Sequence, residues 1–204
     1  MKKLLFTCFV SCFMAGFSAD IDHKTGVWIG EDAQKWHVFD DKLADAIAKF
    51  FVGEKADSVI DFGCGMGGYM KVIHDMGILC DGVDGNPATP ELTGGLGKVL
   101  DFSVPVDLGR TYDWVLSLEV GEHLPPQHET TFIENLVKHA REGILLSWAC
   151  QNGPGHFNMR ENDYVKGRMK EYGYISDPIA EKFLRKRCNV HWFRNTVMVF
   201  RKAQ

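Results

Sequence analysis

A glycine-rich turn between a buried strand and a helix is the feature that most constrains this chain. Residues 59–69 are Val-Ile-Asp-Phe-Gly-Cys-Gly-Met-Gly-Gly-Tyr, so a β-branched run ends in an acid just before the glycines begin. Because Gly63 and Gly65 lack a Cβ atom, a ligand can lie directly against backbone N–H groups there. In doubly wound α/β proteins such a turn binds an adenosine-containing cofactor at the carboxyl ends of the strands.

The composition is that of one globular domain. The chain has 204 residues, of which 45% are hydrophobic and 25% charged, and its formal net charge is −4. A mildly acidic chain carries no strong signal for nucleic-acid binding. One basic cluster lies near the C-terminus, where cations favour the end of a helix dipole; a phosphate-rich ligand is the alternative. The cluster consists of Lys182, Arg185, Lys186, Arg187, His191 and Arg194.

Strands and helices are expected to alternate along the chain after residue 32. The expected strands are residues 58–62, 79–84, 97–101, 112–119, 143–149, 173–175 and 196–201, and the expected helices are residues 33–51, 68–76, 126–141, 162–172 and 177–187. This alternation predicts a single Rossmann-like, doubly wound α/β domain. Its seven-stranded sheet is mainly parallel, with helices on both faces.

The N-terminus differs from the rest of the chain. Lys2 and Lys3 precede an apolar run from Leu4 to Phe17, and the small residues Ser18 and Ala19 follow. This pattern is typical of a secretory signal peptide. The run is shorter than the ~20 residues of a membrane-spanning helix, so no transmembrane helix is expected in the mature chain. We therefore expect export and a domain that spans residues 20–204; a cytoplasmic protein with an apolar N-terminal segment is the alternative.

Four cysteines remain outside the N-terminal segment, at positions 64, 80, 150 and 188. Their spacing matches no CxxC or other metal motif. One of them lies inside the glycine turn, where a disulfide would distort the site. We expect free, mostly buried thiols.

Three acids lie at the ends of the first three expected strands. Asp61 places a carboxylate beside the glycine turn, which suits a ligand with an ammonium and a sulfonium group better than a pyrophosphate. Asp84 can accept hydrogen bonds from two ribose hydroxyls. Asp101 and Phe102 are placed to contact an adenine, although a turn-capping role for Asp101 is the alternative. The glycine spacing with Asp84 also fits a dinucleotide fingerprint, so an NAD-linked oxidoreductase stays an alternative.

Together these segments resemble class I S-adenosylmethionine-dependent methyltransferases over roughly residues 35–202. The acid-x-Gly-x-Gly-x-Gly turn matches from Asp61 to Gly67, and the later acids match at Asp84 and Asp101. The resemblance implies S-adenosylmethionine as cofactor, an antiparallel last strand, a cap helix at 33–52 and an α/β core at 58–204. It implies that Gly63, Gly65, Asp61, Asp84, Asp101, Phe102 and Glu119 bind the cofactor. A cofactor-binding module without catalysis is a further alternative.

The segment Glu119-Val-Gly-Glu122-His123 follows the fourth expected strand, where the methyl acceptor should lie. It resembles the same segment of ubiquinone-pathway and small-RNA O-methyltransferases, in which carboxylates and a histidine can bind a divalent cation. The resemblance implies Glu119, Glu122, His123 and His156 as ligands of Mg²⁺ or Mn²⁺. Glu122 and His123 are the candidate catalytic residues, with His123 as a base without metal as one alternative and a structural role as the other.

Four residues near the expected first helix, Trp28, Trp36, His37 and Phe39, can form an aromatic lid, although core packing is the more common role. The motifs indicate a methyl donor, and we expect transfer to an oxygen atom. They leave open the identity of the acceptor, small molecule or macromolecule, and the oligomeric state.

Overall fold

The computed structural model describes residues 21–29 and 37–203. The predicted signal peptide at residues 1–19 and the residue Trp36 lie outside this described part. Within it, no helix combines the length and the apolar character needed to cross a membrane.

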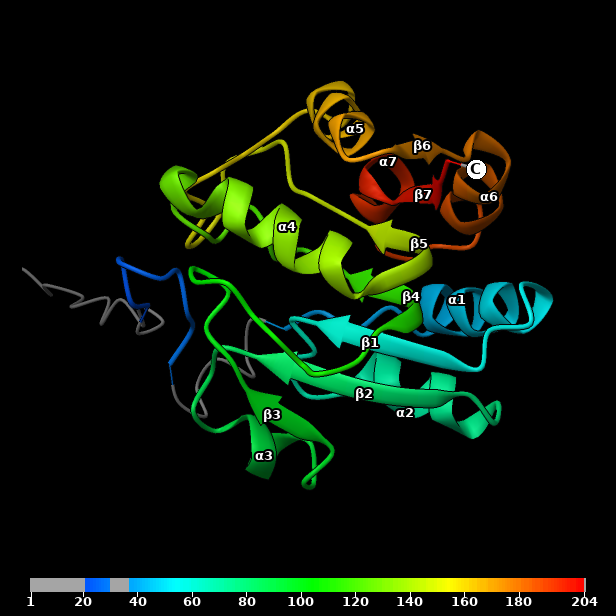
Figure 1. Ribbon diagram of the computed structural model, residues 1–204, viewed down its shortest axis with the longest axis horizontal. Helices are drawn as coiled ribbons and strands as arrows, with labels where there is room; N and C mark the ends of the chain where they lie inside the picture. The colour runs from blue at the N-terminus through cyan, green and yellow to red at the C-terminus, as the bar shows by residue number, and fades with distance from the viewer. Residues whose placement is uncertain (1–20, 30–36, 204) are drawn as a thin grey trace, which may run out of the picture.

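A seven-stranded sheet forms the centre of the protein (Figure 1). The strands are β1 Ser58–Phe62, β2 Leu79–Asp84, β3 Gly97–Val99, β4 Tyr112–Ser117, β5 Ala140–Leu146, β6 Tyr174–Ser176 and β7 Met198–Lys202. They lie in the order β3-β2-β1-β4-β5-β7-β6. Strand β1 pairs in parallel with β2 and β4, whereas β7 runs antiparallel to β5 and β6. The predicted mainly parallel sheet with an antiparallel last strand is therefore confirmed.

Helices pack on both faces of the sheet, because successive strand residues point to opposite faces. The helices are α1 Asp41–Gly53, α2 Gly68–Asp75, α3 Thr89–Leu92, α4 Glu129–His139, α5 Asn162–Glu171, α6 Pro178–Arg185 and α7 Phe193–Thr196, with a short 3-10 turn η2 at Pro126–His128. On β4, Trp114 and Leu116 belong to a core shared with α1, α2 and α6. Val115 between them belongs to a second core shared with α4 and α5.

The helix before β1 is shorter at its start than predicted. It was expected from residue 33, but α1 begins at Asp41 and residues 37–40 are not helical. Asp40 is the reason, because its Oδ1 accepts the backbone N–H of Lys42 at 3.1 Å and of Leu43 at 3.0 Å. An N-cap of this kind satisfies donors that the first helical turn leaves free, so the helix starts there.

Several other element ends differ from the prediction. Strand β5 covers residues 140–146 and not 143–149, because α4 ends at His139 and Ala140 already pairs with Tyr112. Strands β3 and β4 end two residues earlier than predicted, so Asp101 and Glu119 lie in the loops that follow them. The helices α3 and α7 were not predicted, since four residues are too few to show a helical period. The free thiols in the described part agree with the prediction.

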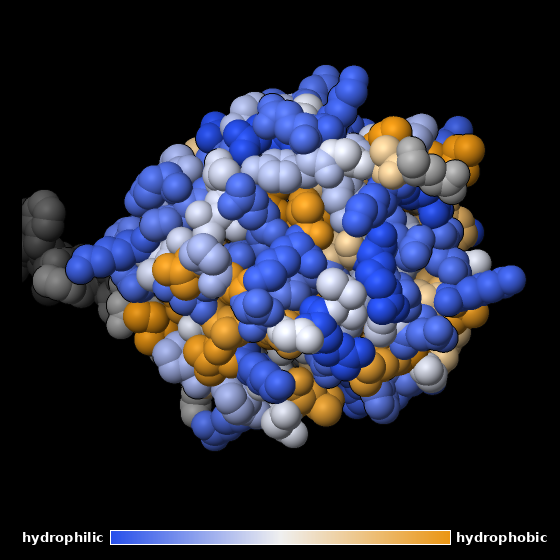
Figure 2. All heavy atoms as spheres, viewed as in Figure 1, coloured by the Kyte–Doolittle hydropathy of each residue, from blue (hydrophilic) through white to orange (hydrophobic). Residues whose placement is uncertain are grey.

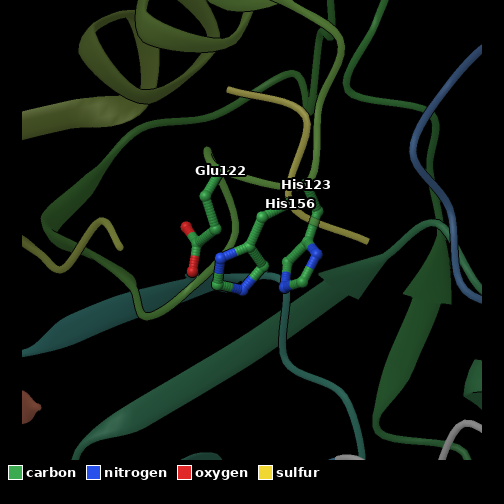
Figure 3. A group of neighbouring side chains, drawn as sticks. All are labelled: Glu122, His123 and His156. Carbon is green, nitrogen blue, oxygen red and sulfur yellow. The ribbon is translucent and has the colours of Figure 1, made fainter. Parts of the chain in front are cut away.

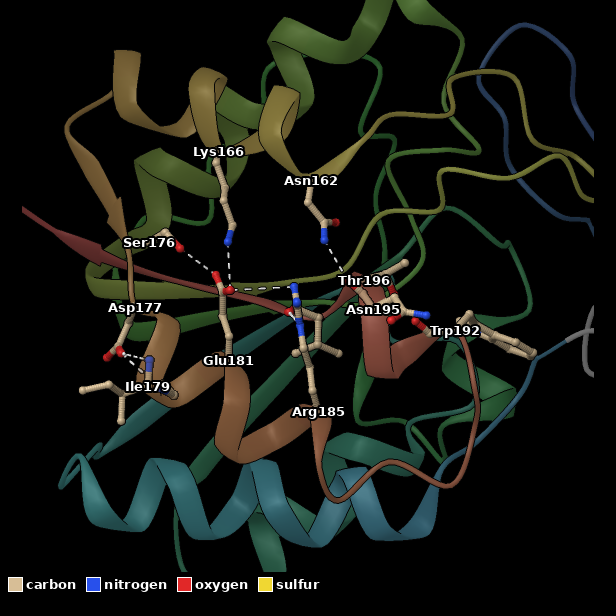
Figure 4. A network of polar contacts seen from close by, with 12 residues as sticks. Asn162, Lys166, Ser176, Asp177, Ile179, Glu181, Arg185, Trp192, Asn195 and Thr196 are labelled. Atoms are coloured by element: carbon tan, nitrogen blue, oxygen red, sulfur yellow. Dashed lines mark hydrogen bonds and ion pairs between the residues drawn. The ribbon is translucent and has the colours of Figure 1, made fainter.

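Polar contacts join α5, β6 and α6 on the C-terminal side of the sheet (Figure 4). Glu181 is 4% exposed and accepts hydrogen bonds from Lys166 Nζ at 2.8 Å and Ser176 Oγ at 2.6 Å. Arg185 pairs with Glu181 at 3.7 Å and donates from Nε to the Val197 carbonyl at 2.7 Å. Arg185, a member of the basic cluster, therefore already forms an ion pair and a hydrogen bond within the protein. Polar side chains cover most of the face shown in Figure 2, with apolar ones in small groups.

The sheet order places a crevice at the carboxyl end of β1. Strands β2 and β3 lie on one side of β1, and β4 to β7 lie on the other. The connections that leave β1 and β4 therefore diverge, and a doubly wound sheet binds its ligand outside such a point.

Candidate active site

A cavity of about 570 Å³ lies at the carboxyl ends of β1, β2 and β4, within the usual size range of ligand pockets. Nearly all residues predicted from the sequence line it, although they come from five separate segments of the chain. The predicted residues in the lining are Asp61, Gly63, Gly65, Asp84, Phe102, Glu119, Glu122, His123 and His156. Asp101 is not among them.

The glycine turn takes a left-handed backbone conformation at Gly63 and at Gly65, where glycine is strongly favoured. Gly63 has φ +88° and Gly65 has φ +51°, both in the left-handed region. A Cβ atom at Gly63 would collide with Val120, and one at Gly65 would lie 2.8 Å from His37 Nδ1. Two consecutive backbone N–H groups, of Gly63 and Cys64, donate to the Val83 carbonyl at 2.8 and 3.1 Å. The turn is thus bound to β2 before any ligand arrives.

Asp84 links the same turn to the end of β2. Its Oδ2 accepts the Gly65 N–H at 2.9 Å and its Oδ1 accepts the Asn86 N–H at 2.9 Å. The carboxylate also lines the cavity. Its lone pairs are numerous enough to accept further hydrogen bonds from a ligand. Asp84 therefore both shapes the glycine turn and faces the position expected for a ribose.

Asp61 is a buried acid beside the turn, only 3% exposed. Burial, and then the nearby charge of Asp84, raise the pKa of Asp61 to about 8. The free protein therefore holds this carboxyl group in its neutral form at pH 7. A cationic ligand group in the cavity would favour the ionised form.

Replacing Asp61 with asparagine is expected to stabilise the ligand-free protein at pH 7 by about 4 kcal/mol, because its pKa is raised from 3.8 to about 8. The pKa of Asp61 is higher in the folded than in the unfolded state, so its contribution to stability is full below pH ~4 and is lost as the pH rises towards 8. Asparagine cannot ionise and escapes this loss. Urea unfolding at pH 4, 6 and 8 measures the effect; a variant no more stable than wild type at pH 8 would contradict it.

Asp101 caps a turn in the structure. Its Oδ1 accepts the Ser103 N–H at 2.8 Å, which is the arrangement of the turn-capping alternative. Its neighbour Phe102 is buried, lines the cavity and packs at 5.3 Å from the Phe62 ring. An apolar wall is therefore present where the adenine was expected, whereas the carboxylate beside it faces the backbone of its own turn.

Glu119 follows β4 in a strained conformation. Its φ of +55° is unusual for a residue with a side chain and often marks a functional site. The side chain accepts from Ser147 Oγ at 2.7 Å and from Thr196 Oγ1 at 3.5 Å. Burial raises the pKa of Glu119, although these two hydrogen bonds oppose the shift. Neither Ser147 nor Thr196 was predicted; a hydroxyl just after a central strand was the available signal for Ser147.

Three of the four predicted metal ligands come together. One ligand atom each from Glu122, His123 and His156 lies within 4.8 Å of the others, and Figure 3 shows the three side chains pointing toward one another. Glu119 does not join this group, because its carboxylate is held by Ser147 and Thr196. Of the four residues predicted as metal ligands, the structure thus brings three together and places Glu119 apart from them.

Among these three residues, Glu122 has the carboxylate that lacks hydrogen-bond partners. It is 0% exposed, and neither carboxylate oxygen makes a hydrogen bond of ordinary geometry with a described residue. Burial, and next the charge of Glu119, raise its pKa well above the ordinary value, although the backbone N–H groups of Glu122 and Ala149 oppose the shift. A buried carboxyl group with so few partners is costly, and this one lines the cavity, where a ligand group can reach it.

His123 is neutral at pH 7, because burial and the nearby His156 and His37 lower its pKa to about 4. Its Nδ1 lies 2.9 Å from the Gly155 carbonyl and 3.2 Å from Trp28 Nε1. The carbonyl only accepts and the indole N–H only donates, so one neutral tautomer can satisfy just one of them. The tautomer that donates to Gly155 leaves Nε2 free to accept a proton or bind a metal.

The N-terminal segment 21–29 covers this end of the cavity. Ile21 and Trp28 form an antiparallel bridge, and Val27 lies against Gly85. Together with His37 and Phe39, Trp28 lines the cavity, so these members of the predicted aromatic lid do face the site. The contact between Trp28 and His123, 95 residues apart, had no signal in the sequence.

A family model described as a methyltransferase domain matches residues 35–175. The chain belongs to this family. The resemblance to class I S-adenosylmethionine-dependent methyltransferases is therefore confirmed, and the NAD-linked alternative is not supported.

Two curated relatives are methyltransferases whose names give different acceptors. Norajmaline N-methyltransferase of Rauvolfia serpentina is 29% identical over 138 residues, which cover 60% of the chain and 47% of that protein. The probable chloroplastic tocopherol O-methyltransferase of Oryza sativa subsp. japonica is 28% identical over 130 residues, which cover 56% of the chain and 35% of that protein. The matched regions thus span less than half the length of these relatives.

Solved structures of methyltransferases share the fold. Magnesium protoporphyrin IX methyltransferase from Synechocystis PCC 6803, with bound SAH, has a TM-score of 0.59 and 18% identity, covering 78% of the chain and 82% of that protein. The sugar N-methyltransferase KedS8 from Streptoalloteichus sp ATCC 53650 has a TM-score of 0.63 and 12% identity, covering 80% and 88%. At these identities the likeness extends to the fold alone.

Proposed function

We propose that the protein transfers a methyl group from S-adenosylmethionine to an oxygen atom of an acceptor. One observation carries the proposal: a single cavity holds the glycine turn with Asp61 and Asp84 at one end and the unpartnered Glu122 with two histidines at the other. The cavity thus has a place for a donor and a place for an acceptor.

The residues at the cofactor end suit S-adenosylmethionine. Gly63 and Gly65 line the cavity beside the position proposed for the methionine part, and Asp61 provides a carboxyl group for its ammonium. Asp84 suits the ribose hydroxyls and Phe102 the adenine ring. The bound cofactor supplies an electrophilic methyl group, and most of the rate then comes from holding the acceptor in line with it.

At the other end, Glu122 and His123 act on the acceptor hydroxyl. Glu122 accepts a hydrogen bond from the hydroxyl, and the neutral His123 accepts its proton through Nε2. We propose as a second version of this mechanism that Mg²⁺ or Mn²⁺ binds Glu122, His123 and His156, since carboxylate and imidazole ligands suit such ions. His123 Nε2 would then be a ligand and would not accept the proton. A cation there would lower the pKa of the acceptor hydroxyl.

Calorimetric titration of the protein with S-adenosylhomocysteine, and with NAD in parallel, tests the donor site. We expect micromolar binding of S-adenosylhomocysteine and none of NAD; the reverse order would contradict the proposal. Release of S-adenosylhomocysteine from S-adenosylmethionine is then measured with catechol, phenol and ribonucleoside acceptors. Tight binding without release on any acceptor would instead support a non-catalytic binding module.

A further inference from the structure

Glu129 is a buried carboxylate that the proposed reaction does not use. It is the first residue of α4 and is 4% exposed. Its Oε2 accepts from Asn158 Nδ2 at 3.0 Å and from Arg160 Nε at 2.7 Å, and its Oε1 accepts from the Tyr164 hydroxyl at 2.6 Å. One side chain thus binds α4 to α5 and to the loop between β5 and α5.

The Glu129 carboxyl group, which accepts these three hydrogen bonds, is ionised. Burial alone would raise the pKa of Glu129, but hydrogen bonds from Tyr164, Arg160 and Asn158 outweigh it and hold the pKa below its ordinary value. The Arg160 guanidinium also stacks over the Tyr164 ring at 4.6 Å from its centroid. Charge-assisted hydrogen bonds of this kind are stronger than neutral ones, so the junction is rigid.

The loop that Glu129 holds, residues 150–161, carries one wall of the active-site cavity. Its two ends meet where the Arg160 N–H donates to the Ala149 carbonyl at 3.1 Å. Near its middle, the backbone N–H groups of Phe157 and Asn158 both donate to the Glu122 carbonyl, at 2.8 and 2.9 Å. The loop is therefore fastened directly to the residue whose carboxylate faces the acceptor.

His156 lies within this fastened stretch, two residues before Asn158. Its Nδ1 lies 2.7 Å from the Gln151 carbonyl, and the carbonyl of its neighbour Gly155 lies 2.9 Å from His123 Nδ1. A shift of Asn158 would therefore move His156 and also change the contact that selects the tautomer of His123. Figure 3 shows how closely the three side chains of this cluster approach one another.

We propose that Glu129 is a positioning residue: through Asn158 and Arg160 it holds the 150–161 loop so that His156 stands beside Glu122 and His123. The inference rests on the proposed methyl transfer for its effect on activity. Its effect on the loop can be measured without any turnover.

The test is Glu129→Gln, which keeps the side-chain shape and removes the charge. We expect amide hydrogen exchange at Phe157 and Asn158 to become at least tenfold faster, with exchange in β1 unchanged. Turnover should fall about 30-fold and Mn²⁺ affinity about tenfold, while the affinity for S-adenosylhomocysteine stays within threefold. Glu134→Gln is the matched control, because this exposed carboxylate of the same helix contacts only the Tyr172 hydroxyl, at 3.3 Å, among the described side chains; it should change none of these values.

Two further variants keep the proposal testable if Glu129→Gln folds poorly. Tyr164→Phe removes one hydrogen bond and leaves the charge, so it should cause the same pattern with smaller changes. If Glu129 acts through His156, Glu129→Gln should weaken Mn²⁺ binding no further in a His156→Ala background. Unchanged loop exchange in Glu129→Gln, or faster exchange with wild-type turnover and Mn²⁺ binding, would overturn the proposal. A wild-type protein that binds no S-adenosylhomocysteine would contradict the proposed function instead, while the exchange measurement would still test the loop.

Discussion

Replacing Asp84 with alanine is expected to weaken S-adenosylhomocysteine binding about 100-fold. The carboxylate accepts the Gly65 and Asn86 N–H groups at 2.9 Å each and also faces the cavity. In the proposed complex, two ribose hydroxyls donate to this carboxylate, and hydrogen bonds to a charged acceptor contribute about 1.5 kcal/mol each. A loss of about 3 kcal/mol corresponds to about two orders of magnitude in affinity. Because the variant also frees the Gly65 N–H, the glycine turn should lose order before the ligand binds.

Calorimetric titration of the variant and the wild type measures this loss. Asp107→Ala is the matched control, since that exposed aspartate also caps a turn, by accepting the Gly109 N–H at 2.8 Å, but lies outside the cavity. Its affinity should stay within twofold of wild type. A loss below fivefold in Asp84→Ala would show that the ligand does not depend on this carboxylate and that the cofactor end has been assigned incorrectly.

The second large effect is expected at the acceptor end. Glu122→Gln and His123→Ala should each lower turnover at least 100-fold, while S-adenosylhomocysteine affinity stays within threefold of wild type. Acid–base or metal assistance contributes roughly two to four orders of magnitude in rate, and both residues lie in the group that would provide it. The cofactor contacts are made by other segments of the chain, so donor binding should be preserved.

Steady-state assays with and without excess chelator separate the two versions of this mechanism. Loss of turnover on chelation, with recovery on adding Mn²⁺, would support the cation. Turnover that survives chelation would remove the cation and leave His123 as the base. Glu142→Gln, an exposed carboxylate on β5 outside the cavity, should behave as wild type. Normal turnover in Glu122→Gln would contradict both versions.

Local sequence patterns were enough to predict several of the residues that line the cavity at the end of β1. The residues of the glycine turn are contiguous, and strand ends carry Asp61 and Asp84 into the same crevice whenever parallel neighbours pair. Strand and helix periods likewise predicted the sheet and its helical layers. The errors are the two four-residue helices α3 and α7, which were missed, and the ends of elements, as at Asp40, whose side chain caps the start of α1.

The acceptor half depended on contacts that no local pattern encodes. Resemblance to known families placed His156 among the ligands, but the same reasoning included Glu119, whose carboxylate the structure shows bound to Ser147. The contact of Trp28 with His123 and the contacts of Glu129 gave no signal, because each joins residues that are far apart in the chain.

The sequence alone determined the fold class, the family and the cofactor turn of this protein, because backbone shape and hydrophobic period are properties of neighbouring residues. Only the tertiary structure decided which polar side chains lie close to Glu122 and which, like Glu119, form hydrogen bonds elsewhere. Side-chain hydrogen bonds form over about 3 Å, and whether two distant residues come that close depends on how the loops after β4 and β5 are fastened to one another.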